Sequence, residues 1–566
     1  MSFKEEYKRW LAYEICDNEI KEELQSIQGN EAAISDRFYR DLAFGTGGLR
    51  GIIGAGTNRM NIYTVRKATQ GISEYLNERF DDVSVAIAYD SRKNSKRFAY
   101  TAAEVFAGNG IKVYLFDTLM PTPMLSFAVR QLGCSAGVVI TASHNPAKYN
   151  GYKLYGNDGC QITLEVAEKI TGYITRIDIF EDIRKANFKE QISNGMICYI
   201  GQDTIDAYFK AVKEYSVFDR NECLKVVYTP LNGAGLKPVL RILNEIGVHD
   251  ITVVPEQENP DENFTTCPYP NPEEKEALEL GVALCKKTGA DLLLGTDPDC
   301  DRVGTAVRHN GEYILINGNQ MGVLLFDFVC MMRSNTDGLP RQPLAVKTIV
   351  TTEMAQSVAN EYGVELVNVL TGFKFIGEQI GVLEKKGEVE RYVFGFEESY
   401  GYLSGTHVRD KDAVNASMLI CEMAAYYKTK GMTLIDRLDE LYQKHGYYFD
   451  HLESKIYEGA QGNERMNQIM RKLRMNFPEE IAGIRVNRTY DYLNRICYKN
   501  SIQTPINLPS SDVLGFELEG GSKITIRPSG TEPKLKIYYS LRTPDRDTAS
   551  DIYREVEKAV NKTLEG

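Results

Sequence analysis

The hydrophobic pattern of the chain repeats one arrangement three times: an apolar strand, an amphipathic helix, a glycine and a second strand. The first copy predicts a strand at 85–89, a helix at 98–107 and a strand at 113–116, and later copies begin at 224–228 and 344–350. Glycine commonly ends a helix, and strand–helix–strand order favours parallel pairing. The pattern therefore predicts three related α/β domains.

Each copy then reaches a further apolar strand that ends in a polar loop. In open α/β sheets, ligands bind just beyond the carboxyl ends of the strands. The first loop offers a serine hydroxyl, the second three carboxylates, and the third two carboxylates and a hydroxyl that could bind sugar hydroxyls. An ordinary turn or helix cap is the alternative for each loop alone. The loops are Thr141-Ala142-Ser143-His144-Asn145-Pro146, Gly295–Arg302 with Asp297, Asp299 and Asp301, and Gly395–Gly401 with Glu397 and Ser399.

The second loop predicts a metal site. Its three aspartates occupy alternate positions, and hard oxygen ligands suit Mg²⁺. A calcium-binding EF-hand would need Gly and Glu where this chain has Arg302 and Arg308, so that motif is excluded. A solvated acidic turn is the alternative, but three clustered like charges repel one another without a cation.

The C-terminal part has a different pattern. Closely spaced strands at 513–518, 524–527 and 535–541 precede a helix with apolar residues at i, i+4 spacing, which predicts an α+β module. It carries Arg527-Pro528-Ser529-Gly530-Thr531, where a guanidinium, two hydroxyls and a glycine could cradle a phosphate. A hairpin turn is the alternative. The glycine-rich stretch 44–51, with Arg50, is a weaker candidate for anion binding.

Composition excludes several other classes of protein. The net charge of −12 argues against a general nucleic-acid or membrane binder. No apolar run is long enough to span a membrane, and the start of the sequence does not have the pattern of a secretory signal. Eleven scattered cysteines without a CxxC pair predict neither a zinc site nor a disulfide framework. Residues 3–40 predict amphipathic surface helices. We therefore expect a cytoplasmic protein with small-molecule partners.

Together the loops supply a serine nucleophile, a divalent-metal site, a hydroxyl-binding loop and, at 527–531, a phosphate-binding loop. The Walker A pattern of nucleotide phosphoryl transfer is absent. Exchange of phosphate between a serine and a sugar phosphate fits this set of groups. A metal-dependent phosphatase and a catalytically inactive sugar-phosphate-binding protein are the alternatives.

The four motifs, in this order and spacing, resemble the α-D-phosphohexomutase superfamily of phosphoglucomutases and phosphomannomutases over about residues 40–566. The resemblance implies an α/β protein in which three related domains and a C-terminal α+β domain surround a central cleft. The boundaries we expect are 1–200 for the N-terminal helices and phosphoserine domain, 201–317 for the metal-binding domain, 318–445 for the sugar-binding domain and 446–566 for the phosphate-binding domain.

The resemblance also implies residue roles. Ser143 is the phosphorylated serine, and it holds Mg²⁺ through its phosphate together with Asp297, Asp299 and Asp301. Arg50, His144 and Lys153 fall among the catalytic groups. Lys153 is a candidate base, but a lysine is ordinarily protonated at neutral pH and would need a lowered pKa. The implied substrate-binding residues are Lys347, Lys374, Glu397, Ser399, Arg409, Arg527, Ser529, Gly530 and Thr531.

The reaction that the resemblance implies is two phosphoryl transfers through a sugar bisphosphate. Segments 371–374 and 405–412 resemble the long branch that contains phosphoglucomutases and phosphopentomutases, whereas Ser399-Tyr400-Gly401 departs from the Ser-Gly-His of many dual-specificity members. We expect a phosphoglucomutase that interconverts glucose 1-phosphate and glucose 6-phosphate, with glucose 1,6-bisphosphate as its intermediate and activator. Phosphopentomutase and phosphomannomutase remain alternatives, and the sequence leaves the oligomeric state open.

Overall fold

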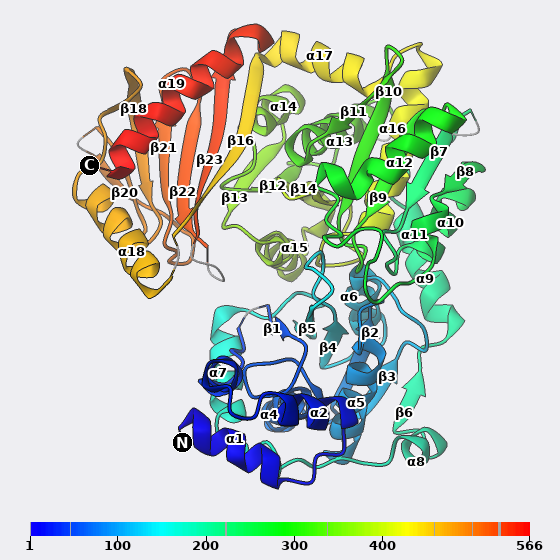
Figure 1. Ribbon diagram of the computed structural model, residues 1–566. Helices are drawn as coiled ribbons and strands as arrows, with labels where there is room; N and C mark the ends of the chain where they lie inside the picture. Colours follow the sequence, from blue (N-terminus) through cyan, green and yellow to red (C-terminus); the bar gives the residue numbers. More distant parts are fainter. Residues whose placement is uncertain are drawn as a thin grey trace. The chain divides into compact units, whose positions relative to one another are not determined.

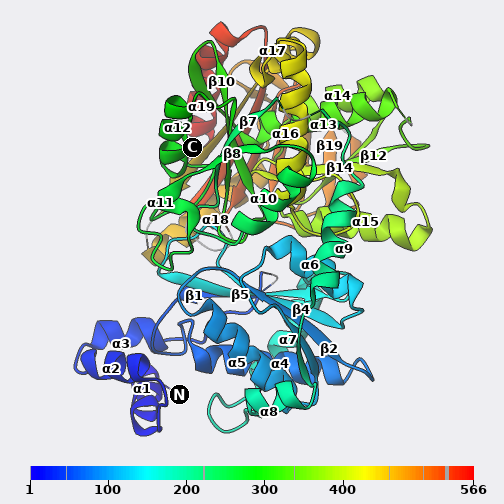
Figure 2. The same cartoon turned by 90° about the vertical axis from the view of Figure 1, so that its right-hand side faces the viewer.

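The structure is a computed structural model that describes residues 2–45, 47–220, 223–336, 338–457, 459–500, 502–529 and 534–565. The chain forms two compact units. Figures 1 and 2 show its helices and strands from two directions. The first unit comprises residues 1–316, 377–389 and 401–428, and the second comprises 317–376, 390–400 and 429–566.

The first unit begins with the predicted surface helices, α1 (Phe3–Ala12), α2 (Asn18–Ser26) and α3 (Glu31–Phe38). Each starts at a residue whose side chain accepts a hydrogen bond from the first turn, as helix N-caps commonly do. The only tryptophan, Trp10, is fully buried and packs edge-on against Phe180. This aromatic contact fastens the helices to the α/β domain that follows.

The first α/β domain has a six-stranded sheet in the order β1-β5-β4-β2-β3-β6. Its central strand β2 is parallel to both β3 and β4, as the strand–helix–strand pattern predicts, and β5 returns antiparallel to β4. The strands are β1 (Leu49–Ile52), β2 (Ser84–Tyr89), β3 (Lys112–Leu115), β4 (Ala136–Ile140), β5 (Tyr149–Gly156) and β6 (Ile197–Tyr199). The helices are α4 (Ile62–Asn77), α5 (Ser95–Gly108), α6 (Thr122–Gln131), α7 (Leu164–Ile174), α8 (Phe188–Ser193) and α9 (Gln202–Lys213).

The second α/β domain repeats this core with the sheet order β11-β10-β9-β7-β8, in which β7 is parallel to β8 and β9. Its strands are β7 (Lys225–Thr229), β8 (Asp250–Val253), β9 (Leu292–Thr296), β10 (Val303–His309) and β11 (Glu312–Ile316). Its helices are α10 (Leu236–Glu245), α11 (Pro255–Glu258) and α12 (Lys275–Thr288).

The third copy contributes to both units. In the second unit, β12 (Leu344–Thr348) is parallel to β13 (Glu365–Val369) and to β14 (Tyr392–Glu397). In the first unit, β15 (Gly401–Leu403) leads into α16 (Ala413–Thr429), which is buried along most of its length. The remaining elements of this copy are α13 (Gly318–Ser334), α14 (Met354–Tyr362), α15 (Phe373–Lys386), the 3₁₀ helix η1 (Val389–Arg391) and α17 (Leu434–His445).

The C-terminal part of the second unit is a largely antiparallel sheet in the order β16-β23-β22-β21-β18-β19-β20, with β17 paired to β18. Together with its helices it confirms the predicted α+β module. Its strands are β16 (Tyr447–Ile456), β17 (Glu480–Ile481), β18 (Ile484–Asp491), β19 (Ile496–Lys499), β20 (Ile502–Pro505), β21 (Leu514–Leu518), β22 (Lys523–Pro528) and β23 (Lys534–Thr543). Its helices are α18 (Gly459–Met475) and α19 (Arg546–Glu565).

Candidate active site

The serine loop follows β4 directly, and Ser143 has a left-handed backbone with φ +52°. This conformation is strained for a residue with a side chain, and such strain persists where neighbours enforce it. The Ser143 N–H donates to Thr141 Oγ1 at 2.8 Å, and the Thr141 hydroxyl donates to Asp90 Oδ2 at 2.7 Å. The turn therefore presents the serine hydroxyl in one fixed direction at the edge of the sheet.

Arg92 holds the same loop through its backbone. Its guanidinium donates to the carbonyls of Ser143 and Asn145, the second at 2.6 Å, and to one further carbonyl of the loop and one at the start of β5. Its Nε lies 3.1 Å from Asp90 Oδ2, and both side chains are completely buried. Sequence reasoning missed this pair, although its position at the carboxyl end of β2, the first strand of the repeat, is a usable signal.

The three predicted metal ligands form one buried cluster after β9. One ligand atom from each of Asp297, Asp299 and Asp301 lies within 4.8 Å of the others. The Ser143 hydroxyl donates to Asp297 Oδ2 at 3.0 Å. The structure thus brings together a serine of the first domain and an acidic loop of the second, far apart in the sequence.

The cluster fits a hard divalent cation. In the described part of the chain, the Oδ1 atoms of Asp299 and Asp301 are buried and accept no hydrogen bond, which is costly unless another partner takes them. Burial, together with the charges of Asp301 and Asp299, raises the pKa of Asp297 well above its usual range. A bound cation would give the two unpaired oxygens a partner and would offset the repulsion among the carboxylates. The cluster could therefore bind a metal ion.

Two lysines surround the aspartates. Lys153 Nζ lies 2.7 Å from Asp299 Oδ2, and Lys411 Nζ lies 3.2 Å from Asp301 Oδ2. Burial alone would lower the pKa of Lys153, but Asp299 and Asp301 outweigh it and raise the pKa. Lys153 is therefore a cation in this state. It can donate a proton, and it could act as a base only after losing this pairing.

Lys411 was not among the predicted site residues. In the sequence, its segment 405–412 is noted only for its resemblance to the branch of the superfamily that contains phosphoglucomutases and phosphopentomutases. Asp410 accepts from Tyr155 at 2.7 Å, and Asp412 accepts from Tyr208 at 2.9 Å, so the segment is anchored to β5 and α9. No sequence signal connects Lys411 with Asp301, because only the folded chain brings them together.

Arg50 and His144 also reach the serine loop. Arg50 donates to Asn145 Oδ1 at 3.3 Å, and His144 Nδ1 lies 3.2 Å from the Ser143 Oγ. Burial, followed by the charges of Arg302, Arg50 and Arg92, lowers the pKa of His144 well below its usual value. The imidazole is therefore neutral at physiological pH and can exchange a hydrogen bond with the serine.

The predicted sugar loop lies in the second unit, at the end of β14. The Ser399 hydroxyl donates to Glu397 Oε1 at 2.9 Å, and Glu398 Oε2 accepts from Thr348 at 3.2 Å. A Cβ at Gly318 would lie only 2.0 Å from the carbonyl oxygen of Glu398, so only glycine permits this approach of α13. The packing holds the loop in one shape with the Glu397 carboxylate largely buried.

The predicted phosphate loop connects β22 and β23 in the same unit. Arg527 pairs with Lys536 in the strand register, and the Ser529 N–H donates to the Lys534 carbonyl at 2.7 Å. Both Arg527 and Ser529 are half-buried, so they remain reachable. Gly530 and Thr531 lie outside the described residues.

Two of the predicted substrate-binding residues are buried and form ion pairs with glutamates of the protein. Lys347 is fully buried, and its Nζ lies 3.1 Å from Glu353 Oε1. Arg409 is 1% exposed, and its Nη2 lies 2.9 Å from Glu384 Oε2. In this structure both side chains stabilise packing and do not line a surface. The third, Lys374, is partly buried and lies 4.9 Å from the ring of Phe375.

Comparison with known proteins identifies the class. Models of the phosphoglucomutase/phosphomannomutase α/β/α domains I, II and III match residues 41–180, 206–311 and 317–445. The chain therefore belongs to the phosphoglucomutase/phosphomannomutase family, which confirms the resemblance inferred from the motifs. Its α/β copies and C-terminal β-rich domain confirm the expected fold class, and its relatives place it among the sugar-phosphate isomerases of carbohydrate metabolism.

Within this family, the chain is similar over most of its length to proteins named phosphoglucomutase. The chain is 40% identical over 513 residues to the phosphoglucomutase of Staphylococcus aureus strain USA300, covering 90% of this chain and 91% of that one. It is 37% identical over 527 residues to the phosphoglucomutase of Staphylococcus haemolyticus strain JCSC1435, covering 92% and 94%.

Solved structures share the fold. A putative phosphomannomutase from Thermus thermophilus matches with a TM-score of 0.69 at 22% identity, covering 93% of this chain and all of that one. The Paramecium phosphoglucomutase pp63/parafusin in its open form also matches with a TM-score of 0.69, at 18% identity over 93% and 95%. Among the helices that the structure describes, none is long and apolar enough to cross a bilayer.

Proposed function

We propose that the protein is a phosphoglucomutase that interconverts glucose 1-phosphate and glucose 6-phosphate. The identity to named phosphoglucomutases over nine-tenths of the chain supports this reaction. The observation that carries the chemistry is the 3.0 Å hydrogen bond from Ser143 to Asp297, which joins a strained serine turn to a buried carboxylate cluster.

In the proposed reaction, phospho-Ser143 transfers its phosphoryl group to the free hydroxyl of glucose monophosphate. The oxygen–phosphorus bond at the serine breaks and a new one forms at the sugar hydroxyl. The proton that this hydroxyl loses ends on the Ser143 oxygen, which becomes a free hydroxyl. The product, glucose 1,6-bisphosphate, then returns its other phosphoryl group to Ser143. The same bisphosphate, from solution, would phosphorylate an enzyme that lacks the phosphate.

The chain's own residues organise this transfer. Arg92 and Asp90 hold the serine turn in place, and the cations of Lys153 and Lys411 balance negative charge around the transferring group. Asp297, Asp299 and Asp301 would hold Mg²⁺. When bound, the ion neutralises charge on the phosphoryl oxygens.

In the second unit, Glu397 and Ser399 would bind sugar hydroxyls. Arg527 and Ser529, with Gly530 and Thr531, would hold the phosphate that is not being transferred. For the domains we propose the boundaries 1–200, 201–317, 318–445 and 446–566, and for the protein a place in the cytoplasm.

Coupled assays test the choice of sugar. We expect turnover of glucose 1-phosphate in the presence of Mg²⁺ and glucose 1,6-bisphosphate to exceed that of mannose 1-phosphate and ribose 1-phosphate. Faster turnover of mannose 1-phosphate would identify a phosphomannomutase, and faster turnover of ribose 1-phosphate a phosphopentomutase. Release of inorganic phosphate without isomerisation would identify a phosphatase and overturn the proposal.

A further inference from the structure

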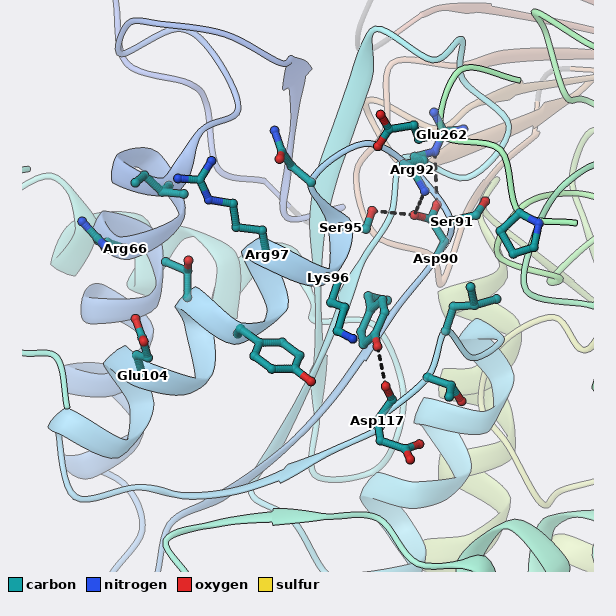
Figure 3. Close-up of a pocket in the computed structure, with 18 of the residues that line it drawn as sticks. Arg66, Asp90, Ser91, Arg92, Ser95, Lys96, Arg97, Glu104, Asp117 and Glu262 are labelled. Carbon is teal, nitrogen blue, oxygen red and sulfur yellow. Dashed lines mark hydrogen bonds and ion pairs between the residues drawn. The ribbon is translucent and has the colours of Figure 1, made fainter. Parts of the chain in front are cut away.

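The serine loop is held by side chains of the first α/β domain. Ser95 donates to Asp90 Oδ1 at 2.6 Å, Asp90 is paired with Arg92, and Arg92 donates to carbonyls of the loop (Figure 3). The loop that carries the three aspartates, the metal loop, instead follows β9 of the second domain. The position of the serine relative to a bound metal ion therefore depends on how the metal loop is held against the first domain.

Thr122 connects the two domains at this point. It is the first residue of α6 in the first domain and is completely buried. Its N–H donates to the carbonyl oxygen of Asp299 at 2.9 Å, and its hydroxyl donates to Asp299 Oδ2, also at 2.9 Å. One residue of the first domain thus binds both the backbone and the side chain of a proposed metal ligand. The mechanism above gives Thr122 no role.

The two carboxylate oxygens of Asp299 have different surroundings. Oδ2 accepts from Thr122 and also from Lys153, the second at 2.7 Å. Oδ1 is buried and, among the residues that the structure describes, accepts no hydrogen bond. A carboxylate with one oxygen held by two donors does not rotate freely, so its other oxygen keeps a fixed direction. That other oxygen is the one left for a cation.

The Thr122 hydroxyl fixes this carboxylate in a way that a lysine does not. Asp301 also has an Oδ1 without a hydrogen bond in the described part of the chain, but the donors near its Oδ2 are Lys153 at 3.4 Å and Lys411 at 3.2 Å. A lysine ammonium sits at the end of a flexible four-carbon stem. A threonine side chain is short and β-branched, which restricts its rotation. The backbone bond from the same residue restricts it further.

We propose that Thr122 is a positioning residue for the metal site. It holds the metal loop against the first domain and, by occupying Asp299 Oδ2, keeps Oδ1 available for the cation. Groups that hydrogen-bond to metal ligands orient them, and their loss typically costs about 10–100-fold in metal affinity. Thr122 acts through Asp299 and does not itself bind the ion. The inference rests on the proposed function, because it takes Mg²⁺ as the ion of these aspartates.

Calorimetric titration of the full chain with Mg²⁺ tests this role. Thr122→Val keeps the shape of the side chain and the backbone N–H, and it removes only the hydroxyl donor. We expect the Mg²⁺ affinity to fall by about tenfold, at the lower end of the usual range because Lys153 still donates to Oδ2. Thr122→Ser restores a hydroxyl and should recover most of the affinity.

A coupled assay gives a second measurement. Thr122→Val should need about tenfold more Mg²⁺ for half-maximal turnover of glucose 1-phosphate, because it binds the ion more weakly. The KM for glucose 1-phosphate at saturating Mg²⁺ should change little, since the proposed sugar and phosphate loops lie in the second unit. A loss of stability alone would not raise the Mg²⁺ requirement.

Thr69→Val is the matched control. Thr69, in α4, is also completely buried, and its hydroxyl donates to the Val65 carbonyl at 2.8 Å and lies 3.3 Å from the Tyr152 hydroxyl. The control loses a buried threonine hydroxyl that is not bonded to the metal loop, so its Mg²⁺ affinity should equal that of the wild type. If Thr122→Val does not fold, Thr122→Ala removes the same donor without placing a methyl group against the carboxylate.

The possible failures are distinguishable. Unchanged Mg²⁺ affinity in Thr122→Val, with a wild type that binds the ion, would overturn the positioning role and leave the proposed function intact. An equal loss of affinity in Thr69→Val would also overturn the role, because the effect would then come from general destabilisation. A wild type that neither binds Mg²⁺ nor isomerises glucose 1-phosphate would overturn the proposed function, and this inference with it.

Discussion

Replacing Arg92 by methionine should damage both stability and turnover. The substitution keeps the approximate length of the side chain and removes every donor. Arg92 donates to four backbone carbonyls, three in the serine loop and one at the start of β5, and is fully buried with Asp90. Breaking a buried ion pair from one side costs about 3–5 kcal/mol, because the remaining charge stays buried without a partner. We therefore expect the free energy of unfolding of the first unit to fall by about that amount.

The effect on turnover follows from the geometry. Ser143 keeps its strained backbone only while its neighbours hold it, and a displacement of about 1 Å at a reacting group can cost about a hundredfold in rate. We expect Arg92→Met to lower kcat by about a hundredfold with a smaller change in KM, since the sugar and phosphate loops lie in the second unit. Urea unfolding and a coupled assay for glucose 6-phosphate measure the two effects.

The matched control is the double variant Asp90→Asn with Arg92→Met. It removes the unpaired charge while the amide can still accept a hydrogen bond from Thr141, so part of the stability should return. Turnover should stay low, because the loop carbonyls still lack their donor. Normal kcat in Arg92→Met would refute the reasoning, as would a double variant that regains activity together with stability.

Four other perturbations have defined outcomes. Ser143→Ala should lower turnover by several orders of magnitude and remove one phosphate from the intact-protein mass, and a fully active variant would disprove the phosphoserine mechanism. Chelation should abolish activity, and Asp299→Asn should weaken Mg²⁺ binding in a calorimetric titration; unchanged metal affinity would exclude this ligand. Arg527→Ala should lower kcat/KM by about ten- to hundredfold through loss of a charged contact of about 1.5–3 kcal/mol, and equal kcat/KM for every sugar monophosphate would mark the loop as a hairpin turn. Burial raises the pKa of Glu422 to about 7, so the protonated side chain stabilises the fold below about pH 4.5. This contribution, about 3 kcal/mol, is lost as the pH rises to 7. Urea unfolding of Glu422→Gln should lack that loss, and parallel pH curves for variant and wild type would contradict the assignment.

Local pattern determined much of the fold. The three α/β copies and the strands that lead into the loops of Ser143, Asp297 and Glu397 follow from apolar runs and helical periodicity, which are properties of neighbouring residues. The pattern did not reveal strands such as β20, because its residues Ile502–Pro505 are all exposed and show no alternation of buried and exposed positions. An exposed strand at the edge of a sheet forms only through its hydrogen bonds with the neighbouring strand. The tertiary fold determines which strand is that neighbour.

The sequence by itself determined which chemical groups the protein carries: a serine on a turn, three carboxylates in one loop, a hydroxyl-binding loop and a phosphate-binding loop. Only the tertiary structure decided which of them meet. It placed Ser143 beside Asp297 and brought Lys411 to Asp301. It also paired the buried cations of Lys347 and Arg409 with more exposed carboxylates. The physical reason is that contacts between domains depend on the packing of whole sheets and helices. Motif spacing along the chain describes only what each loop can do alone.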